Sequence, residues 1–174
     1  MSSLFVTGTD TEVGKTVIST AVMEYLQKQG KRVVGMKPIA SGCDVTEQGL
    51  RNDDAVAIQQ QCSKPIEYET INPYAFEPAI APHIAAKQVG VEIDITYIQR
   101  QFCVLQQDAD AVIVEGAGGW FVPLNDELTM ADLAIRLGLP VIVVVAIKLG
   151  CINHALLTIQ AVEQSGLPIQ GWVA

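Results

Sequence analysis

The residues best suited to chemistry lie in a glycine-bounded stretch near the start of the chain, residues 8–16. Gly14, Lys15 and Thr16 follow one another at its end. A loop that leads into a helix offers unpaired backbone N–H groups and the positive end of the helix dipole, and a lysine there adds an ammonium group. These groups suit the dense negative charge of phosphate, and the Thr16 hydroxyl suits Mg²⁺. The stretch therefore predicts a phosphate-binding loop.

The glycine spacing of this loop differs from the usual phosphate-loop pattern. That pattern has four residues between its glycines, whereas five separate Gly8 from Gly14 here. An ordinary glycine-rich turn between a strand and a helix therefore stays open as the alternative. The flanking sequence favours the phosphate loop, because residues 4–6 predict a buried strand and a helix follows. The predicted apolar face of that helix consists of Val17, Ile18, Ala21, Val22, Tyr25 and Leu26.

A second lysine follows the next predicted strand, residues 32–36. Lys37 and Pro38 come directly after this strand, and Ser41 and Gly42 lie shortly beyond. A strand, helix and strand in succession imply parallel strands, and parallel sheets bind ligands at the carboxyl ends of their strands. We therefore expect Lys37 to face the phosphate loop. A surface lysine in a polar turn is the alternative.

Two acids open a further predicted helix. Asp53 and Asp54 lie in its first turn, after Asn52. Asn52 or Asp53 can cap the helix, and an acid in the first turn is favoured by the helix dipole. Capping explains one carboxylate and leaves the other available as a ligand.

Glu115 ends a predicted buried strand that begins at Asp110, and Gly116, Ala117, Gly118 and Gly119 follow it. A glutamate at the carboxyl end of a buried parallel strand is poorly placed for stability and well placed to bind a metal. We expect it to hold Mg²⁺ together with Thr16 and Asp54. The alternative is a tight turn with a solvated glutamate.

The rest of the chain alternates helices and strands. Helices are predicted near residues 83–88, 95–106 and 130–137, and strands near 140–147 and 169–174, whereas residues 63–82 predict an irregular excursion that covers the edge of the site. Residues 148–154 open another helix, with Ile152, Ala155, Leu156 and Ile159 as its apolar face. The start of this helix can hold a carboxylate, and an ordinary strand-to-helix connection is an equal alternative.

Composition points to a compact globular chain. It has 174 residues, 49% of them hydrophobic, and a formal net charge of −8. That charge argues against nucleic-acid and anionic membrane surfaces, and the longest apolar run, residues 141–147, is too short to span a bilayer. A cytoplasmic location is the default expectation. The cysteines are too scattered to suggest a zinc site or a disulfide framework: Cys43, Cys62, Cys103 and Cys151.

These elements predict a single α/β domain over residues 1–174, with a P-loop-type open, mostly parallel sheet and helices on both faces. The strand predicted at 169–174 has no covering helix after it. We therefore expect the domain to be incomplete at its C-terminal end.

The phosphate loop, residues 37–42, Asp54, residues 115–119 and residues 148–154 together resemble the dethiobiotin synthetase family. The resemblance runs along the whole chain and includes the longer loop, which that family carries. Partition-type ATPases share the fold but have an extra lysine early in the loop, where this chain has Asp10 and Glu12. A nucleotide-switched ATPase of that type is the competing class; an amidotransferase-like synthetase would need a glutaminase segment.

The resemblance implies a reaction in which 7,8-diaminononanoate, CO₂ and ATP give dethiobiotin, ADP and phosphate. In that family the carbamate of the diamine takes the γ-phosphate, and the second amine closes the ring. The catalytic residues it implies are Lys37, Lys15, Thr11 and Glu12. The residues that it implies bind ATP are Glu12, Val13, Gly14, Lys15, Thr16, Val17, Asp54, Glu115, Gly116, Ala117 and Gly118. It also implies that Thr16, Asp54 and Glu115 bind Mg²⁺.

Substrate contacts also follow from the resemblance. The diamine or its carbamate would touch Thr11, Lys37, Ser41 and Gly118, and its carboxylate would reach the helix start at Gly150, Cys151, Ile152 and Asn153 of the neighbouring subunit. A homodimer with active sites at the interface is implied. In the family the adenine is contacted by a later segment that this sequence does not include.

Overall fold

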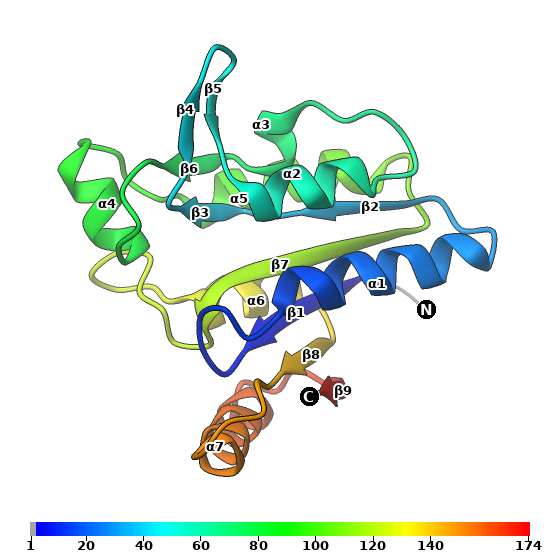
Figure 1. The fold of residues 1–174 in the computed structure, drawn as a ribbon, viewed down its shortest axis with the longest axis vertical. Coiled ribbons are helices and arrows are strands. Elements are labelled where there is room, and N and C mark those ends of the chain that lie inside the picture. Colours follow the sequence, from blue (N-terminus) through cyan, green and yellow to red (C-terminus); the bar gives the residue numbers. More distant parts are fainter. Residues whose placement is uncertain (1–2) are drawn as a thin grey trace.

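The computed structural model describes residues 3–174, and five parallel strands form its central sheet (Figure 1). The strand order is β2-β7-β1-β8-β9, so the first two strands in sequence are separated by β7. This arrangement confirms the predicted open, parallel sheet. The strands are β1 (Leu4–Gly8), β2 (Val33–Met36), β7 (Ala111–Gly119), β8 (Val141–Val144) and β9 (Ile169–Val173).

Helices cover both faces of the sheet because alternate strand residues point to opposite sides. In β1, Leu4 and Val6 belong to one apolar cluster, and Phe5 belongs to the other. The first cluster takes in residues of α1 (Lys15–Lys28), α2 (Asp53–Gln60) and α3 (Tyr68–Ile71). The second takes in residues of α4 (Pro82–Gln88), α5 (Ile95–Gln106), α6 (Met130–Leu137) and α7 (Cys151–Gln164). No helix within residues 3–174 is both long and apolar enough to cross a membrane.

Short strands follow β2 beyond the edge of the main sheet. β3 (Ile39–Ser41) pairs in parallel with β6 (Tyr74–Phe76), and β4 (Asp44–Thr46) forms a hairpin with β5 (Gly49–Arg51) that projects from the molecule (Figure 1). The prediction of an irregular segment over residues 63–82 is therefore wrong in part, because α3 and β6 lie within it. Strand β6 exists through pairing with a distant segment, which local sequence does not reveal.

The buried faces of two helices differ from the predictions. In α1, Val17 and Tyr25 are 70% and 58% exposed, while Lys15 and Ser19 are buried on the face that meets the sheet. In α7, Ile152 and Leu156 are exposed as well. The predicted faces are nevertheless correct in part, since Leu26 of α1 is buried and Ala155 and Ile159 of α7 pack against the core. In α1 two polar side chains at the site also take inward positions, so apolar residues alone do not mark its buried face.

Strand β7 runs four residues further than predicted, through the glycines to Gly119, which pairs with Gly8 across a register shift. Glu115 therefore lies within the strand rather than at its end. A Cβ atom on Gly116 would come within 3.2 Å of the Phe5 ring, so this glycine also makes room for the core.

Gly35 offers a direct test of how tightly α2 packs on β2. A Cβ atom there would overlap Ile58 Cγ2 and lie 3.0 Å from Met23 Sδ, and Ile58 is fully buried. We expect Gly35→Ala to lower the free energy of unfolding by about 1–3 kcal/mol through overpacking, measured by urea titration. Gly171→Ala is the matched control, because a Cβ atom on this strand glycine meets nothing within 4 Å. Equal stability of the two variants would contradict the packing.

Candidate functional site

The phosphate loop joins the end of β1 to the start of α1. Gly14 has φ 93° and Glu12 has φ 58°, a left-handed conformation that side chains such as glutamate rarely adopt. A Cβ atom on Gly8 would overlap Val13 and lie 3.1 Å from both the Asp10 carbonyl oxygen and Lys15 Cδ. A side chain at position 8 would therefore overlap the loop that folds back over it, so this longer loop needs glycine there.

Lys15 is 7% exposed and curls back into the loop. Its Nζ donates a hydrogen bond to the Asp10 carbonyl oxygen at 2.8 Å. Burial, and then repulsion from Lys37, lower the pKa of Lys15 to about 8, despite three nearby carboxylates. An incoming anion would favour the charged form of this lysine.

Lys37 follows β2 and is 4% exposed. Its Nζ donates to Glu115 Oε1 at 2.6 Å and to Asp54 Oδ2 at 3.2 Å, with the Gly116 carbonyl oxygen at 3.4 Å. Burial disfavours the ammonium, but the two carboxylates outweigh it and hold the pKa of Lys37 above its ordinary value. Lys37 is thus a buried cation paired with two carboxylates, and the alternative of a surface lysine in a polar turn is excluded.

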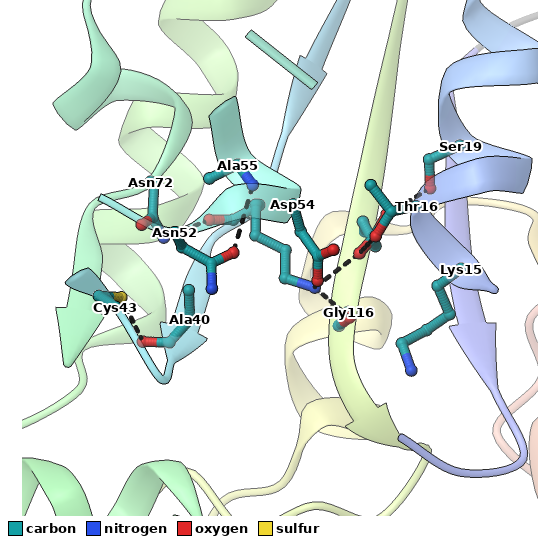
Figure 2. A network of polar contacts seen from close by, with 12 residues as sticks. Lys15, Thr16, Ser19, Ala40, Cys43, Asn52, Asp54, Ala55, Asn72 and Gly116 are labelled. Carbon is teal, nitrogen blue, oxygen red and sulfur yellow. Dashed lines mark hydrogen bonds and ion pairs between the residues drawn. The ribbon is translucent and has the colours of Figure 1, made fainter. Parts of the chain in front are cut away.

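Glu115 is completely buried, so the alternative of a solvated glutamate is wrong. Its Oε1 accepts hydrogen bonds from Lys37 and from Thr16 Oγ1 at 2.9 Å, and its Oε2 accepts one from Ser19 Oγ at 2.7 Å. Figure 2 shows Thr16 and Ser19 approaching from α1 and Asp54 from α2. Both oxygens of the buried carboxylate are therefore paired.

Asp54 lies in the first turn of α2, and its side chain is 46% exposed. Asn52 is the N-cap, since its Oδ1 accepts from the Ala55 N–H at 3.2 Å, which confirms one of the two predicted caps. Burial opposes ionisation of Asp54, but the Lys37 ammonium and the Thr16 hydroxyl together lower its pKa. Asp54 stays ionised and faces the cleft.

The donor set around Thr16 suits Mg²⁺. It consists of two carboxylates and a hydroxyl, and hard oxygen ligands of this kind complete the magnesium shell with phosphate and water. Within residues 3–174 no group of three or more His, Cys, Asp or Glu side chains is placed to hold a metal. A bound cation would therefore also need oxygen ligands from phosphate and water. The site fits a cation that arrives with phosphates.

A cleft of about 830 Å³ lies over these groups. Most of the predicted site residues line it: Thr11, Glu12, Gly14, Lys15, Thr16, Val17, Lys37, Ser41, Asp54, Ala117 and Gly118. The Ser41 hydroxyl is buried without a hydrogen-bond partner in the described part of the chain, so it is available to a ligand. Residues 79–82 line the cleft too, which agrees with the predicted cover at its edge.

Other predicted residues lie elsewhere. Val13, Glu115 and Gly116 are buried and do not line the cleft, and Glu115 is connected to it through Thr16 and Lys37. The start of α7, from Gly150 to Asn153, is largely exposed and outside the cleft lining. It approaches the phosphate loop on its outer side, where Lys148 Nζ lies 2.9 Å from Asp10 Oδ2.

Ser19 is a site residue that the sequence analysis missed. Its position one helical turn after Lys15 places it on the same face of α1. A helical wheel started from the lysine, rather than from the apolar residues, would have found it.

The fold and the site together define a P-loop α/β protein that binds nucleoside triphosphate. A family model described as "AAA domain" matches residues 2–174. Among solved structures, the kinase domain of the Escherichia coli tyrosine kinase ETK is similar, with a TM-score of 0.58 and 16% identity. The match covers 98% of this chain and 66% of that domain, just under two thirds, and at this identity it shows the fold alone.

The sequence comparisons are more specific. The chain is 52% identical over 170 residues to ATP-dependent dethiobiotin synthetase BioD 1 of Escherichia coli O157:H7, which covers 98% of this chain and 76% of that protein. It is 53% identical over 173 residues to BioD of Marinobacter nauticus, with 98% and 74% covered. It is 51% identical over 175 residues to BioD of Pseudomonas paraeruginosa, with 100% and 77% covered. The chain belongs to the dethiobiotin synthetase family.

We expect Ser19→Ala to destabilise the protein, because it leaves Glu115 Oε2 buried without its donor. The loss of free energy of unfolding should be about 1–3 kcal/mol by urea titration. Thr20→Ala is the matched control, since its Oγ1 donates only to the Thr16 and Val17 carbonyls of its own helix, and should change stability by less than about 0.5 kcal/mol. Similar losses in both variants would show that the Ser19 contact carries no special weight.

Proposed function

We propose that this chain catalyses the reaction for which its relatives are named, the ATP-dependent closure of 7,8-diaminononanoate with CO₂ to dethiobiotin. Identity of about half over nearly the whole chain supports the assignment. The structural observation that carries it is the convergence of Lys37, Glu115 and Thr16 beside the phosphate loop. Phosphoryl transfer to a carbamate needs positive charge on both sides of the transferred group, and two lysines are available there.

The phosphate loop would bind the triphosphate. Backbone N–H groups of residues 12–17 and the Lys15 ammonium would hold its oxygens, and the field at the start of α1 would favour their charge. Mg²⁺, held by Thr16, Asp54 and Glu115, would neutralise developing charge on the phosphates. Glu115 is engaged by Lys37, so binding of the cation would redistribute these contacts.

Lys37 would act on the carbamate. Its ammonium stays charged because Glu115 and Asp54 surround it, and an anionic carbamate in the cleft would lie between Lys37 and the γ-phosphate. A carbamate oxygen attacks phosphorus as the bond to ADP breaks, and the free amine then attacks the carbamate carbon and releases phosphate. Thr11, Ser41 and Gly118 line the same cleft and would orient the diamine, with Glu12 beside them.

A homodimer would complete the site. We propose that the helix start at residues 150–153 of a second copy binds the carboxylate of the diamine, because on its own subunit this turn is exposed. It includes the exposed Ile152 and follows the exposed Leu149, and exposed apolar residues of this kind are common at subunit interfaces. We also propose that the chain forms a single domain, since both apolar clusters pack on the central sheet. A cytoplasmic location is proposed as well, because ATP and CO₂ are available there.

The test of this function is acceptor dependence. ADP release, followed by a coupled assay, should rise when diamine and bicarbonate are added together, and should stop when Mg²⁺ is chelated. A partition-type ATPase would hydrolyse ATP at the same rate without the acceptor. Absence of any increase would reject the ligase assignment.

Lys37→Gln should separate catalysis from nucleotide binding. We expect kcat to fall by about 10²–10³-fold while the KM for ATP changes little, because Lys37 acts on the transferred group. Lys87→Gln removes an exposed lysine that pairs with Asp126 and is the matched control. Turnover of Lys37→Gln comparable with that of the control, in a folded protein, would remove Lys37 from the catalytic groups.

A further inference from the structure

A closed chain of hydrogen bonds runs behind the cleft and connects the two residues that flank it, Lys37 and Asp54. It begins at Asn72, which is 3% exposed and lies between α3 and β6. Asn72 Nδ2 donates to the Lys37 carbonyl oxygen at 2.7 Å, and the Lys37 N–H donates to the Ile71 carbonyl oxygen at 2.9 Å. Both backbone polar groups of Lys37 are therefore held by adjacent residues of this segment.

The chain continues through one tyrosine hydroxyl. Tyr68 is 5% exposed, and its hydroxyl donates to Asn72 Oδ1 at 2.9 Å and accepts from the Asn52 N–H at 2.8 Å. A hydroxyl has a single proton, so this arrangement sets the direction of both hydrogen bonds. The Tyr68 hydroxyl thereby ties the backbone next to Lys37 to the residue that begins α2.

Asn52 completes this chain of contacts, which we call the Tyr68 circuit and which consists of Lys37, Asn72, Tyr68, Asn52 and Asp54. Asn52 caps α2, and Asp54 lies in the first turn of that helix, where its Oδ2 accepts from Lys37 Nζ (Figure 2). The Arg51 guanidinium lies 4.1 Å from the centre of the Tyr68 ring and pairs with Glu69 at 3.3 Å. The ring is therefore covered by the guanidinium, and the hydrogen bonds from Tyr68 to Asn72 and from Asn72 to Lys37 are buried.

We propose that Tyr68 and Asn72 are positioning residues that fix the distance between the Lys37 ammonium and the Asp54 carboxylate. Apart from this circuit, α2 is held by the packing of Ile58 against β2 and by its contacts with α1 and α3. Neither residue lines the cleft, so they act through the groups that do. The consequence for turnover rests on the proposed function.

Tyr68→Phe removes only the hydroxyl and keeps the ring under Arg51. We expect kcat to fall by about 10- to 100-fold, as for other residues that orient metal and phosphate ligands indirectly, with no comparable change in the KM for ATP. Hydrogen exchange should also speed up at the start of α2, because the Asn52 N–H loses its acceptor. The exchange measurement requires no substrate.

Tyr74→Phe is the matched control. Its hydroxyl likewise accepts one backbone N–H, that of Asp94 at 3.0 Å, but lies outside the circuit. We expect normal turnover in the control and a lower thermal stability in Tyr68→Phe, which leaves the buried Asn72 Oδ1 without its donor, so turnover is compared at a temperature where both variants are folded. Equal turnover in both, or unchanged exchange at residues 52–56 in Tyr68→Phe, would overturn the positioning role. If the unmodified protein lacked acceptor-dependent turnover, the proposed function would fail, while the exchange comparison would still decide whether the circuit holds α2.

Discussion

The buried ion pair between Lys37 and Glu115 is the interaction on which the site depends. Placing two charges where water cannot reach them is costly, and the cost is offset only when every charged atom has a partner. Glu115 has three donors, and Lys37 has two carboxylates and a carbonyl. These partners come from α1, α2, β7 and the residue that follows β2, so the pair forms only when these segments are assembled. The same requirement makes each partner sensitive to small displacements.

This pair gives two nearby lysines different electrostatic characters. Lys37 is held as a cation by its carboxylates, whereas burial and the repulsion of Lys37 lower the pKa of Lys15. Lys15 therefore gains most from an incoming phosphate, which supplies the negative charge it lacks. A protein with a net charge of −8 can in this way bind a polyanion through a few placed groups, despite its unfavourable overall field.

Local sequence was a good guide where chemistry and backbone requirements coincide. The phosphate loop, the lysine after β2 and the Asn52 cap depend on neighbouring residues, and the structure has the loop and the cap where they were predicted. In α1 the apolar pattern identified the buried Leu26 but not the buried Lys15 and Ser19, because the partners of these two polar side chains lie about 100 residues away or across the loop. Strand β7 was predicted too short, since the glycines that suggest a turn are extended by pairing with β1.

The amino-acid sequence by itself determined the class of fold and the kinds of groups at the site, because these follow from periodicity, glycine placement and residue chemistry. Only the tertiary structure decided how those groups pair. Whether Glu115 faces solvent, a metal or a lysine depends on which strands become neighbours, and β7 comes to lie between β1 and β2 only in the folded sheet. The Tyr68 circuit likewise joins segments whose hydrogen bonds have no local signature, since each partner is set by packing rather than by spacing along the chain.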